Sequence, residues 1–246
     1  MIKRIYIVAF LTSFLINQEM SAETILDSMT AVLSPQNFKA MMRQIIQTTN
    51  EQERIFEYDY FSGNNGENLL MRYVKPKKIK GNAFLIKNSG DDIWVYFPRT
   101  RRTRKLASHA KKQKVQGSDF SYEDYSGSNT WKEDYHYKRL EDPDKDLFQL
   151  EFLPKPDVVT SYSKMEIVLQ QSDFYPIEMK YYNEKRIHLK TLYFEDISEV
   201  EGFTTALKMR MTNHQEGTET RMEIINITYD IKYDDNFFTE RSLKRK

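Results

Sequence analysis

Short strand-like segments follow one another along most of this sequence, and their succession limits the available folds more than any other feature. Most alternate apolar and polar residues, the pattern of a strand with one buried face. Turn-forming residues separate them, such as Gly-Asn-Asn-Gly at 63–66. About twelve strands are expected, at residues 38–49, 54–61, 69–75, 84–88, 93–97, 131–140, 147–153, 164–171, 177–182, 187–196, 206–213 and 221–230.

The pattern predicts little helix. One amphipathic helix is expected at 23–33, where Ile25, Leu26 and Met29 recur at helical spacing and Pro35 ends it. About eleven or twelve strands with short connections indicate a mainly β sandwich or barrel rather than alternating βαβ units. No glycine- or serine-rich linker divides the chain, so one domain over residues 23–246 is expected.

The first 22 residues have the pattern of a secretory signal peptide. Lys3 and Arg4 precede an apolar run at 5–16, and Ala22 offers a cleavage site before Glu23. The apolar run is too short for a membrane-spanning helix, which needs about 20 residues. The signal-like pattern therefore predicts an exported protein. The sequence also has no cysteine, which excludes disulfides and cysteine-ligated metal.

The strand before residue 98 is apolar on both faces. Ile93, Val95 and Phe97 alternate with Trp94 and Tyr96. Successive side chains of a strand point to opposite faces, so a strand with one wet face would alternate apolar with polar residues. We therefore expect an apolar partner on each side of this strand.

A basic loop follows that strand, and no acid lies between residues 98 and 118. The whole chain has a net charge of only +1, so the positive charge is local, which argues against a nucleic-acid-binding protein. Two interpretations stay open: a solvated loop, or a surface that docks on an acidic partner or on anionic lipid headgroups. The docking candidates are Arg99, Arg101, Arg102, Arg104 and Lys105 within the basic loop 99–114.

The loop ends in the motif Gly-Ser-Asp-Phe-Ser-Tyr-Glu-Asp at 117–124. We expect it to be structural, with Ser118 or Asp119 capping a short helical turn and Phe120 and Tyr122 pinning the loop to the barrel. Its acids are expected to pair with the preceding arginines. The motif residues singled out are Gly117, Ser118, Asp119, Phe120, Tyr122, Glu123 and Asp124.

These features together resemble a known family. A Trp-x-Tyr-x-Pro strand at 94–98, the arginine-rich segment and the 117–124 motif are similar to the outer-membrane lipoprotein-sorting proteins, relatives of the periplasmic lipoprotein carrier LolA. The likeness extends over most of the mature chain, from the helix at 25–29 to Phe-Thr-x-Arg-x-Leu at 238–243. It implies a half-open antiparallel β-barrel of about eleven strands with a short helical lid over an apolar cavity, in the periplasm.

A cavity agrees with the composition, although a filled core is the plainer interpretation of the same residues. Aromatic residues make up 13% of the chain and there are 11 methionines, which suit an adaptable apolar site. A barrel of more than about eight strands also leaves more interior than its side chains fill. The residues expected to line the cavity are Ile25, Leu26, Met29, Phe56, Tyr58, Tyr60, Phe84, Ile86, Trp94 and Tyr96.

Catalytic motifs are weak. None of the four histidines has a metal-ligand spacing relative to another, and no nucleophile elbow or phosphate-binding loop occurs. Asp142, Asp144 and Asp146 alternate as in a calcium loop, but Leu147 and Leu153 replace its glycine and its glutamate. We interpret these aspartates as a hairpin turn and expect neither a metal nor a cofactor.

The leading hypothesis is a non-catalytic carrier of lipid or lipoprotein acyl chains toward the outer membrane, working between an inner-membrane transporter and an outer-membrane acceptor. Because each buried methylene contributes about 0.8 kcal/mol, full burial of three chains would exceed the practical affinity limit of roughly 20 kcal/mol. The cavity is therefore expected to be partly open. One alternative is an accessory periplasmic subunit of an exporter or envelope complex, docking through residues 99–114. Another is a secreted hydrolase using paired carboxylates.

Overall fold

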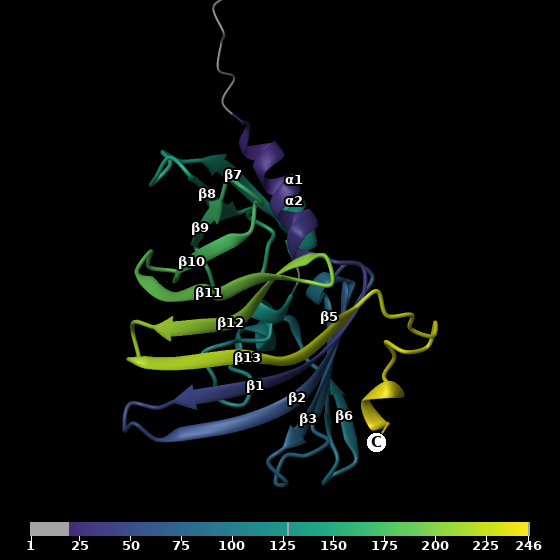
Figure 1. Ribbon diagram of the computed structural model, residues 1–246. Coiled ribbons are helices and arrows are strands. Elements are labelled where there is room, and N and C mark those ends of the chain that lie inside the picture. Colours follow the sequence, from purple (N-terminus) through teal and green to yellow (C-terminus); the bar gives the residue numbers. More distant parts are fainter. Residues whose placement is uncertain (1–19, 127, 246) are drawn as a thin grey trace, which may run out of the picture.

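The computed structural model of the protein describes residues 20–126 and 128–245 (Figure 1). The expected signal peptide lies outside the described residues, except for residues 20–22. All the strands belong to one 13-stranded sheet, in the order β6-β5-β4-β3-β2-β1-β13-β12-β11-β10-β9-β8-β7. Each neighbouring pair is antiparallel. The sheet curls but does not close, so β6 and β7 are its two free edges.

The elements follow the alternation of apolar residues. Strand β9, for instance, buries every second side chain along Lys164–Gln170. The strands are β1 (Phe38–Gln47), β2 (Glu53–Gly63), β3 (Asn68–Lys75), β4 (Ala83–Lys87), β5 (Asp92–Phe97), β6 (Arg102–Lys105), β7 (Tyr135–Arg139), β8 (Leu147–Pro154), β9 (Lys164–Gln170), β10 (Pro176–Tyr182), β11 (His188–Val200), β12 (Phe203–Asn213) and β13 (Thr218–Tyr229). The α-helices are α1 (Ala22–Leu33) and α2 (Trp131–Asp134).

Two meanders build the sheet. Strands β1 to β6 step outward to one edge, and residues 106–134, here called the crossing segment, carry the chain to β7 at the other edge. Strands β7 to β13 then step back until β13 pairs with β1, from Phe38 opposite Tyr229 to Gln47 opposite Glu219. The topology therefore forces the crossing segment to span the curled sheet.

The expected fold class is confirmed: the protein is mainly β, with an open antiparallel sheet and few helices. The expected count of eleven or twelve strands is too low, because residues 102–105, which match none of the twelve expected ranges, form β6 within the basic loop. This strand pairs only with β5 and is largely exposed, so it lacks the apolar alternation that marks the others. Residues 131–134 form the single turn α2 instead of the start of a strand, and Trp131 packs against Phe152 with ring centroids 5.5 Å apart.

Helix α1 forms where its apolar spacing predicts it. Ser21 is the N-cap, and its hydroxyl accepts a hydrogen bond from the Thr24 amide at 3.1 Å. Ile25, Leu26 and Met29 are buried in the main core. The helix packs beside β7 and is tied to α2 by Lys132, which pairs with acids of the first helical turns. Among the described residues, no helix has the length and apolarity needed to cross a bilayer.

Apolar side chains pack on both faces of the first strands. On the inner face of the curl, Ile93 and Val95 belong to the main core. On the outer face, Trp94 and Tyr96 pack with a smaller cluster that includes Leu243, near the C-terminus. The expectation of an apolar partner on each side of this strand is therefore confirmed: the C-terminal segment, residues 230–245, covers the outer face beside β5 (Figure 1).

Candidate functional site

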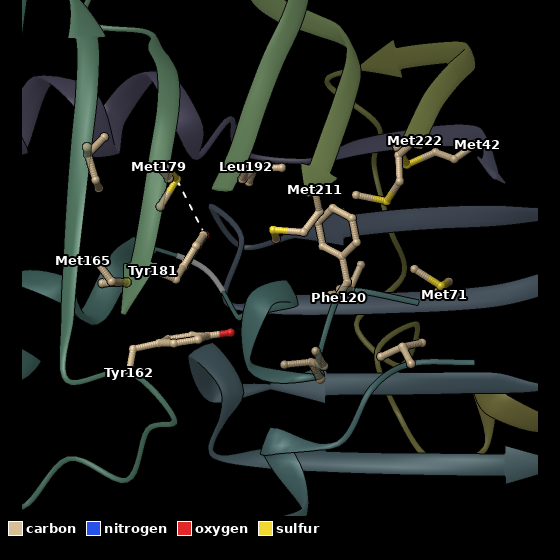
Figure 2. Close-up of a cluster of buried hydrophobic side chains, with 14 of the residues drawn as sticks. Met42, Met71, Phe120, Tyr162, Met165, Met179, Tyr181, Leu192, Met211 and Met222 are labelled. Atoms are coloured by element: carbon tan, nitrogen blue, oxygen red, sulfur yellow. Dashed lines mark hydrogen bonds between the residues drawn. The ribbon is translucent and has the colours of Figure 1, made fainter. Parts of the chain in front are cut away.

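The crossing segment lies against the inner face of the sheet. Phe120 is 2% exposed, and Figure 2 shows its ring directed toward Met211, among the core methionines. The rings of Tyr122 and Tyr125 lie 5.4 and 5.5 Å from that of Phe84 on β4. The expectation that Phe120 pins this stretch to the sheet is therefore confirmed.

A buried ion pair fixes the end of the motif. Lys190 on β11 places its Nζ 2.5 Å from Oδ2 of Asp124, and their side chains are 5% and 1% exposed. Oδ2 also accepts hydrogen bonds from the amide and hydroxyl of Ser121, at 2.6 and 2.8 Å. Oδ1 accepts one from the Tyr162 hydroxyl at 2.6 Å. The carboxylate is thus saturated, as a buried charge requires.

A second buried carboxylate fixes the start of the motif. Asp119 accepts hydrogen bonds from the hydroxyls of Thr218 and Thr220 on β13, at 2.6 and 2.8 Å. Its amide donates to Thr220 at 2.9 Å, and Lys114 lies 3.5 Å from Oδ1. The expected pairing of these acids with the arginines is wrong, because lysines and threonines brought in by the fold are their partners.

The remaining motif residues are structural as well. The carbonyl of Gly117, which has a φ of +71°, accepts a hydrogen bond from Arg54 at 3.0 Å. Ser118 is buried and accepts a hydrogen bond from the Phe120 amide. It therefore turns the chain locally instead of capping a helix. Glu123 accepts hydrogen bonds from the hydroxyl of Thr160 and the amide of Ser161.

A cavity of about 270 Å³ remains on the inner face, between the crossing segment, the end of α1 and the strands around β13. Its walls are mainly apolar, and several of its side chains are only partly buried and so available to a guest. These are Phe38, Tyr60, Trp131, Met209, Ile224 and Ile227. Met42, Met179 and Met222 also line it, and Figure 2 shows them among the buried side chains of the core.

The ionisable side chains in this wall are either kept in their neutral form by burial or paired with an opposite charge. Burial raises the pKa of Tyr175 to about 12, and its hydroxyl accepts a hydrogen bond from the Ala206 amide at 3.0 Å. Burial also raises the pKa of Tyr60. Asp124 reaches the cavity but is committed to Lys190. The cavity thus presents a mainly apolar wall, in which the Asp124 carboxylate is paired, with thioethers that adapt to irregular guests.

The cavity lies elsewhere than the sequence suggests. Of the ten residues expected to line it, Tyr60 does so. Trp94 and Tyr96 do not, because they point to the outer face. Seven others are packed into the main core instead of lining the open space, namely Ile25, Leu26, Met29, Phe56, Tyr58, Phe84 and Ile86.

Sequence reasoning missed the wall contributed by the last strands. Leu192, Met209, Met222 and Ile224 line the cavity from β11, β12 and β13. Their alternation with polar residues was a usable signal for an inward face. It could not indicate which inward positions the crossing segment would cover and which it would leave open.

A second cavity of about 340 Å³ adjoins the first and is more polar. The two share Asp124, Ser126, Trp131 and Tyr181 in their walls. The second opens toward the loop 155–163, where Val159 is 57% exposed. The crossing segment therefore divides the space inside the curl into two compartments.

The basic loop separates into two kinds of charge. Its lysines have acidic partners: Lys105 pairs with Asp92, and the others pair with acids outside the acid-free stretch, such as Lys112 with Glu184 at 3.2 Å. The four arginines are exposed, and no ion pair to them is found among the described residues, namely Arg99, Arg101, Arg102 and Arg104. The unpaired positive charge of the loop is therefore carried by these four arginines. Lys105 is paired with Asp92 within the β5–β6 hairpin.

The titratable groups suggest no metal site. His188 and His214 both contact the Thr191 hydroxyl at 2.9 Å, with their rings 4.3 Å apart. Asp142 pairs with Arg139 in the β7–β8 turn, in accord with the interpretation as a hairpin turn. Within residues 20–126 and 128–245, no group of three or more histidine, aspartate or glutamate side chains is placed to hold a metal ion.

A family model described as "Uncharacterized protein" matches residues 65–245. The chain belongs to this family. Its fold is that of a domain from Vibrio parahaemolyticus described as an outer membrane lipoprotein-sorting protein, with 27% identity over 90% of this chain and 97% of that one and a TM-score of 0.80. A DUF1329 family protein from Desulfovibrio piger has 22% identity over 89% and 96% of the two chains, with a TM-score of 0.78.

A LolA superfamily protein from Nitrosomonas europaea is also similar, with 22% identity over 91% of this chain and 99% of that one and a TM-score of 0.76. The resemblance to the lipoprotein-sorting, LolA-like proteins is therefore confirmed. A comparison with curated proteins gives no match.

Proposed function

We propose that this LolA-like protein is a periplasmic carrier that binds the acyl chain of a lipid or lipoprotein and moves it toward the outer membrane. The observation that carries the proposal is the 270 Å³ apolar cavity on the inner face, lined by side chains that are still partly exposed. The name of the Vibrio parahaemolyticus relative, an outer membrane lipoprotein-sorting protein, supports this assignment. The signal-like residues 1–22 agree with export to the periplasm.

The size of the cavity favours one chain at a time. Pockets for small molecules usually measure ~300–1,000 Å³, so 270 Å³ is near the lower limit. Burying a ten-carbon stretch at about 0.8 kcal/mol per methylene contributes ~8 kcal/mol. That gain corresponds to a dissociation constant of about 1 μM before ordering costs are subtracted. Binding of this strength is reversible, as transfer to an acceptor demands.

The end of α1 is placed to act as a lid. Val32 and Leu33 line the cavity from the last turn of the helix, and Pro35 follows them. The hydroxyl of Ser34 donates a hydrogen bond to Asn129 of the crossing segment at 2.8 Å, which ties the lid to that segment. Movement here would open the cavity without breaking the sheet.

Carriage without catalysis is the interpretation that best fits the buried carboxylates. Asp119 and Asp124 are the buried acids of the crossing segment, and each is held by threonine, tyrosine or lysine partners. Asp124 lines both cavities, but its oxygens already accept hydrogen bonds from Lys190, Ser121 and Tyr162. These two groups serve to anchor the crossing segment instead.

Two neighbouring residues on β13 provide the test. Ile224 lines the cavity, whereas Ile225 is 43% exposed and does not. Ile224→Glu should weaken binding of a fluorescent fatty acid at least tenfold, because a carboxylate in the wall loses its hydration when a chain enters. Fluorescence titration of the purified mature chain measures this.

Ile225→Glu is the matched control and should bind as the unsubstituted protein does. Native mass spectrometry of protein purified from the periplasm should show co-purified lipid, reduced in Ile224→Glu. No uptake of any acyl probe by the unsubstituted protein would remove the proposal, and so would equal effects of the two substitutions.

The four free arginines favour a second candidate, an accessory subunit that docks on an inner-membrane exporter or on another envelope protein. Within residues 20–126 and 128–245 these guanidinium groups have no acidic partner, and on a chain of near-zero net charge they are suited to carboxylate recognition. This role can coexist with carriage, because the arginines do not line the cavity.

A further inference from the structure

The two edges of the open sheet are protected differently. At the β7 edge, α1 packs alongside, and Arg139 donates a hydrogen bond to the Met20 carbonyl at 3.0 Å. At the β6 edge, Arg102, Arg104 and Lys105 are exposed, and the sheet order ends there. An uncovered edge strand presents backbone donors and acceptors to solvent and can pair with another chain.

The register identifies which backbone groups are free. The Leu106 amide donates to the Ile93 carbonyl at 2.8 Å. Hydrogen-bonded pairs alternate along an antiparallel ladder, so Arg104 and Arg102 are the next bonded residues, opposite Val95 and Phe97. The amide and carbonyl groups of Thr103 and Lys105 therefore point away from β5. Their spacing of two residues is that required by an added strand.

The side chains on this edge also have a pattern. The Lys105 Nζ lies 5.2 Å from the centroid of the Trp94 ring on the outer face and pairs with Asp92. Alternation then places Thr103 on the same face, and Arg102 and Arg104 on the opposite face. The two arginines form a ladder at every second residue. An incoming strand would meet them with its own alternate side chains.

We propose that β6 is a docking edge for an acidic extended peptide, which adds to the sheet as a further strand. Its free backbone groups would pair with Thr103 and Lys105, and its acidic side chains, at every second position, would pair with Arg102 and Arg104. Charge complementarity selects this occupant, because a guanidinium binds a carboxylate with two parallel hydrogen bonds. The edge is separate from the cavity, so the inference stands whether or not the protein carries acyl chains.

Three labelled peptides with the same side chains and the same net charge test the proposal. The first carries glutamates at alternate positions, the second carries them in one block, and the third is the first with N-methyl groups on alternate residues. Fluorescence anisotropy with the mature chain should show binding of the first peptide. The second and third should bind at least tenfold more weakly, since one loses the side-chain match and the other loses hydrogen bonds to the edge.

Substitutions complete the test. The R102E/R104E protein should lose binding of the first peptide, whereas R186E, at the exposed Arg186 in the turn between β10 and β11, should retain it. Thr103→Pro removes an outward amide and should weaken binding about tenfold, because proline on an edge spares the ladder to β5. Circular dichroism confirms that each variant is folded.

The contrary outcomes are distinct. Equal binding of all three peptides would overturn the proposal, because simple charge attraction needs no strand pairing. Absence of peptide binding, together with arginine-dependent binding to vesicles of phosphatidylglycerol and phosphatidylcholine, would overturn it in favour of a membrane surface. Binding that is insensitive to R102E/R104E would place the peptide elsewhere.

Discussion

At the scale of single residues, Lys190 and Asp124 hold the crossing segment in place. Both are buried, and they are 66 residues apart in the sequence. The Lys190 ammonium also donates a hydrogen bond to the Asp119 carbonyl at 3.0 Å and lies 5.2 Å from the Tyr162 ring. One cation thus contacts the motif at 117–124 twice, at the backbone carbonyl of Asp119 and at the carboxylate of Asp124.

Replacing Lys190 with methionine should be strongly destabilising. It leaves Asp124 buried without its cation, and breaking a buried pair in this way costs about 3–5 kcal/mol. The matched control is Lys208→Met, which removes an ion pair whose side chains are about half exposed and should therefore cost far less, because solvent screens such pairs. Equilibrium unfolding in urea measures both, and similar losses would contradict the assigned anchoring role.

His188 makes stability depend on pH. Its pKa is lowered, first by desolvation and then by the neighbouring His214 and by Lys180. The unfolded chain therefore binds a proton more readily than the folded one. The stability that is fully present above the ordinary pKa of 6.5 is lost as the pH falls through the lower folded value.

We expect His188→Gln to show a smaller fall in the free energy of unfolding between pH 7 and pH 5 than the unsubstituted protein. Urea titrations at intermediate pH values measure the difference. Profiles that remain parallel across this range would show that another group controls acid sensitivity.

At the scale of elements, the C-terminal segment completes the first meander. Phe237 and Phe238 pack with Tyr233 against the outer face, and the Phe61 ring lies 5.2 Å from that of Phe237. Gly63 at the end of β2 allows this approach, since a Cβ there would lie 2.3 Å from the Phe238 ring. Strand β5, which is apolar on both faces, is thus stable here because the C-terminal segment covers its outer face.

Gly63→Ala should cost about 1–3 kcal/mol, because an added methyl group overpacks a filled site. In a Phe238→Ala background the same substitution should cost little, since the clashing ring is gone. A double-mutant cycle of unfolding free energies measures the coupling. Additive effects would mean that the segment does not contact β2 in solution.

At the scale of the whole molecule, the cavity is a consequence of size and topology. A curled sheet of 13 strands encloses more space than its own side chains fill. The crossing segment fills the centre with Phe120 and its neighbours, and the space left beside the last strands becomes the cavity. The molecule therefore combines a well-packed core on the inner face of β3 to β5 with an adaptable apolar wall on the inner face of β11 to β13.

Local patterns allowed much of this architecture to be predicted. The alternation in β9 and the two apolar faces of β5 follow from spacing alone. Edge strand β6 was not predicted because its residues are exposed and basic, so it lacks the alternation of apolar residues that a buried face produces. Helix α2 was not predicted because it is a single turn of four residues with Trp131 as its one apolar side chain, which is too short to show a helical spacing. Both missed elements are short segments whose conformation is decided by tertiary contacts.

The sequence by itself determined the strand class, the helix at the N-terminal end of the domain and the anchoring of the crossing segment by Phe120. Those features depend on the spacing of apolar residues, which acts over a few positions. Tertiary structure decided that Lys190 would meet Asp124, that Trp94 would turn to the outer face and that Ile224 would border open space. The pairing of distant strands and the path of the crossing segment determine these contacts, and no local pattern encodes either.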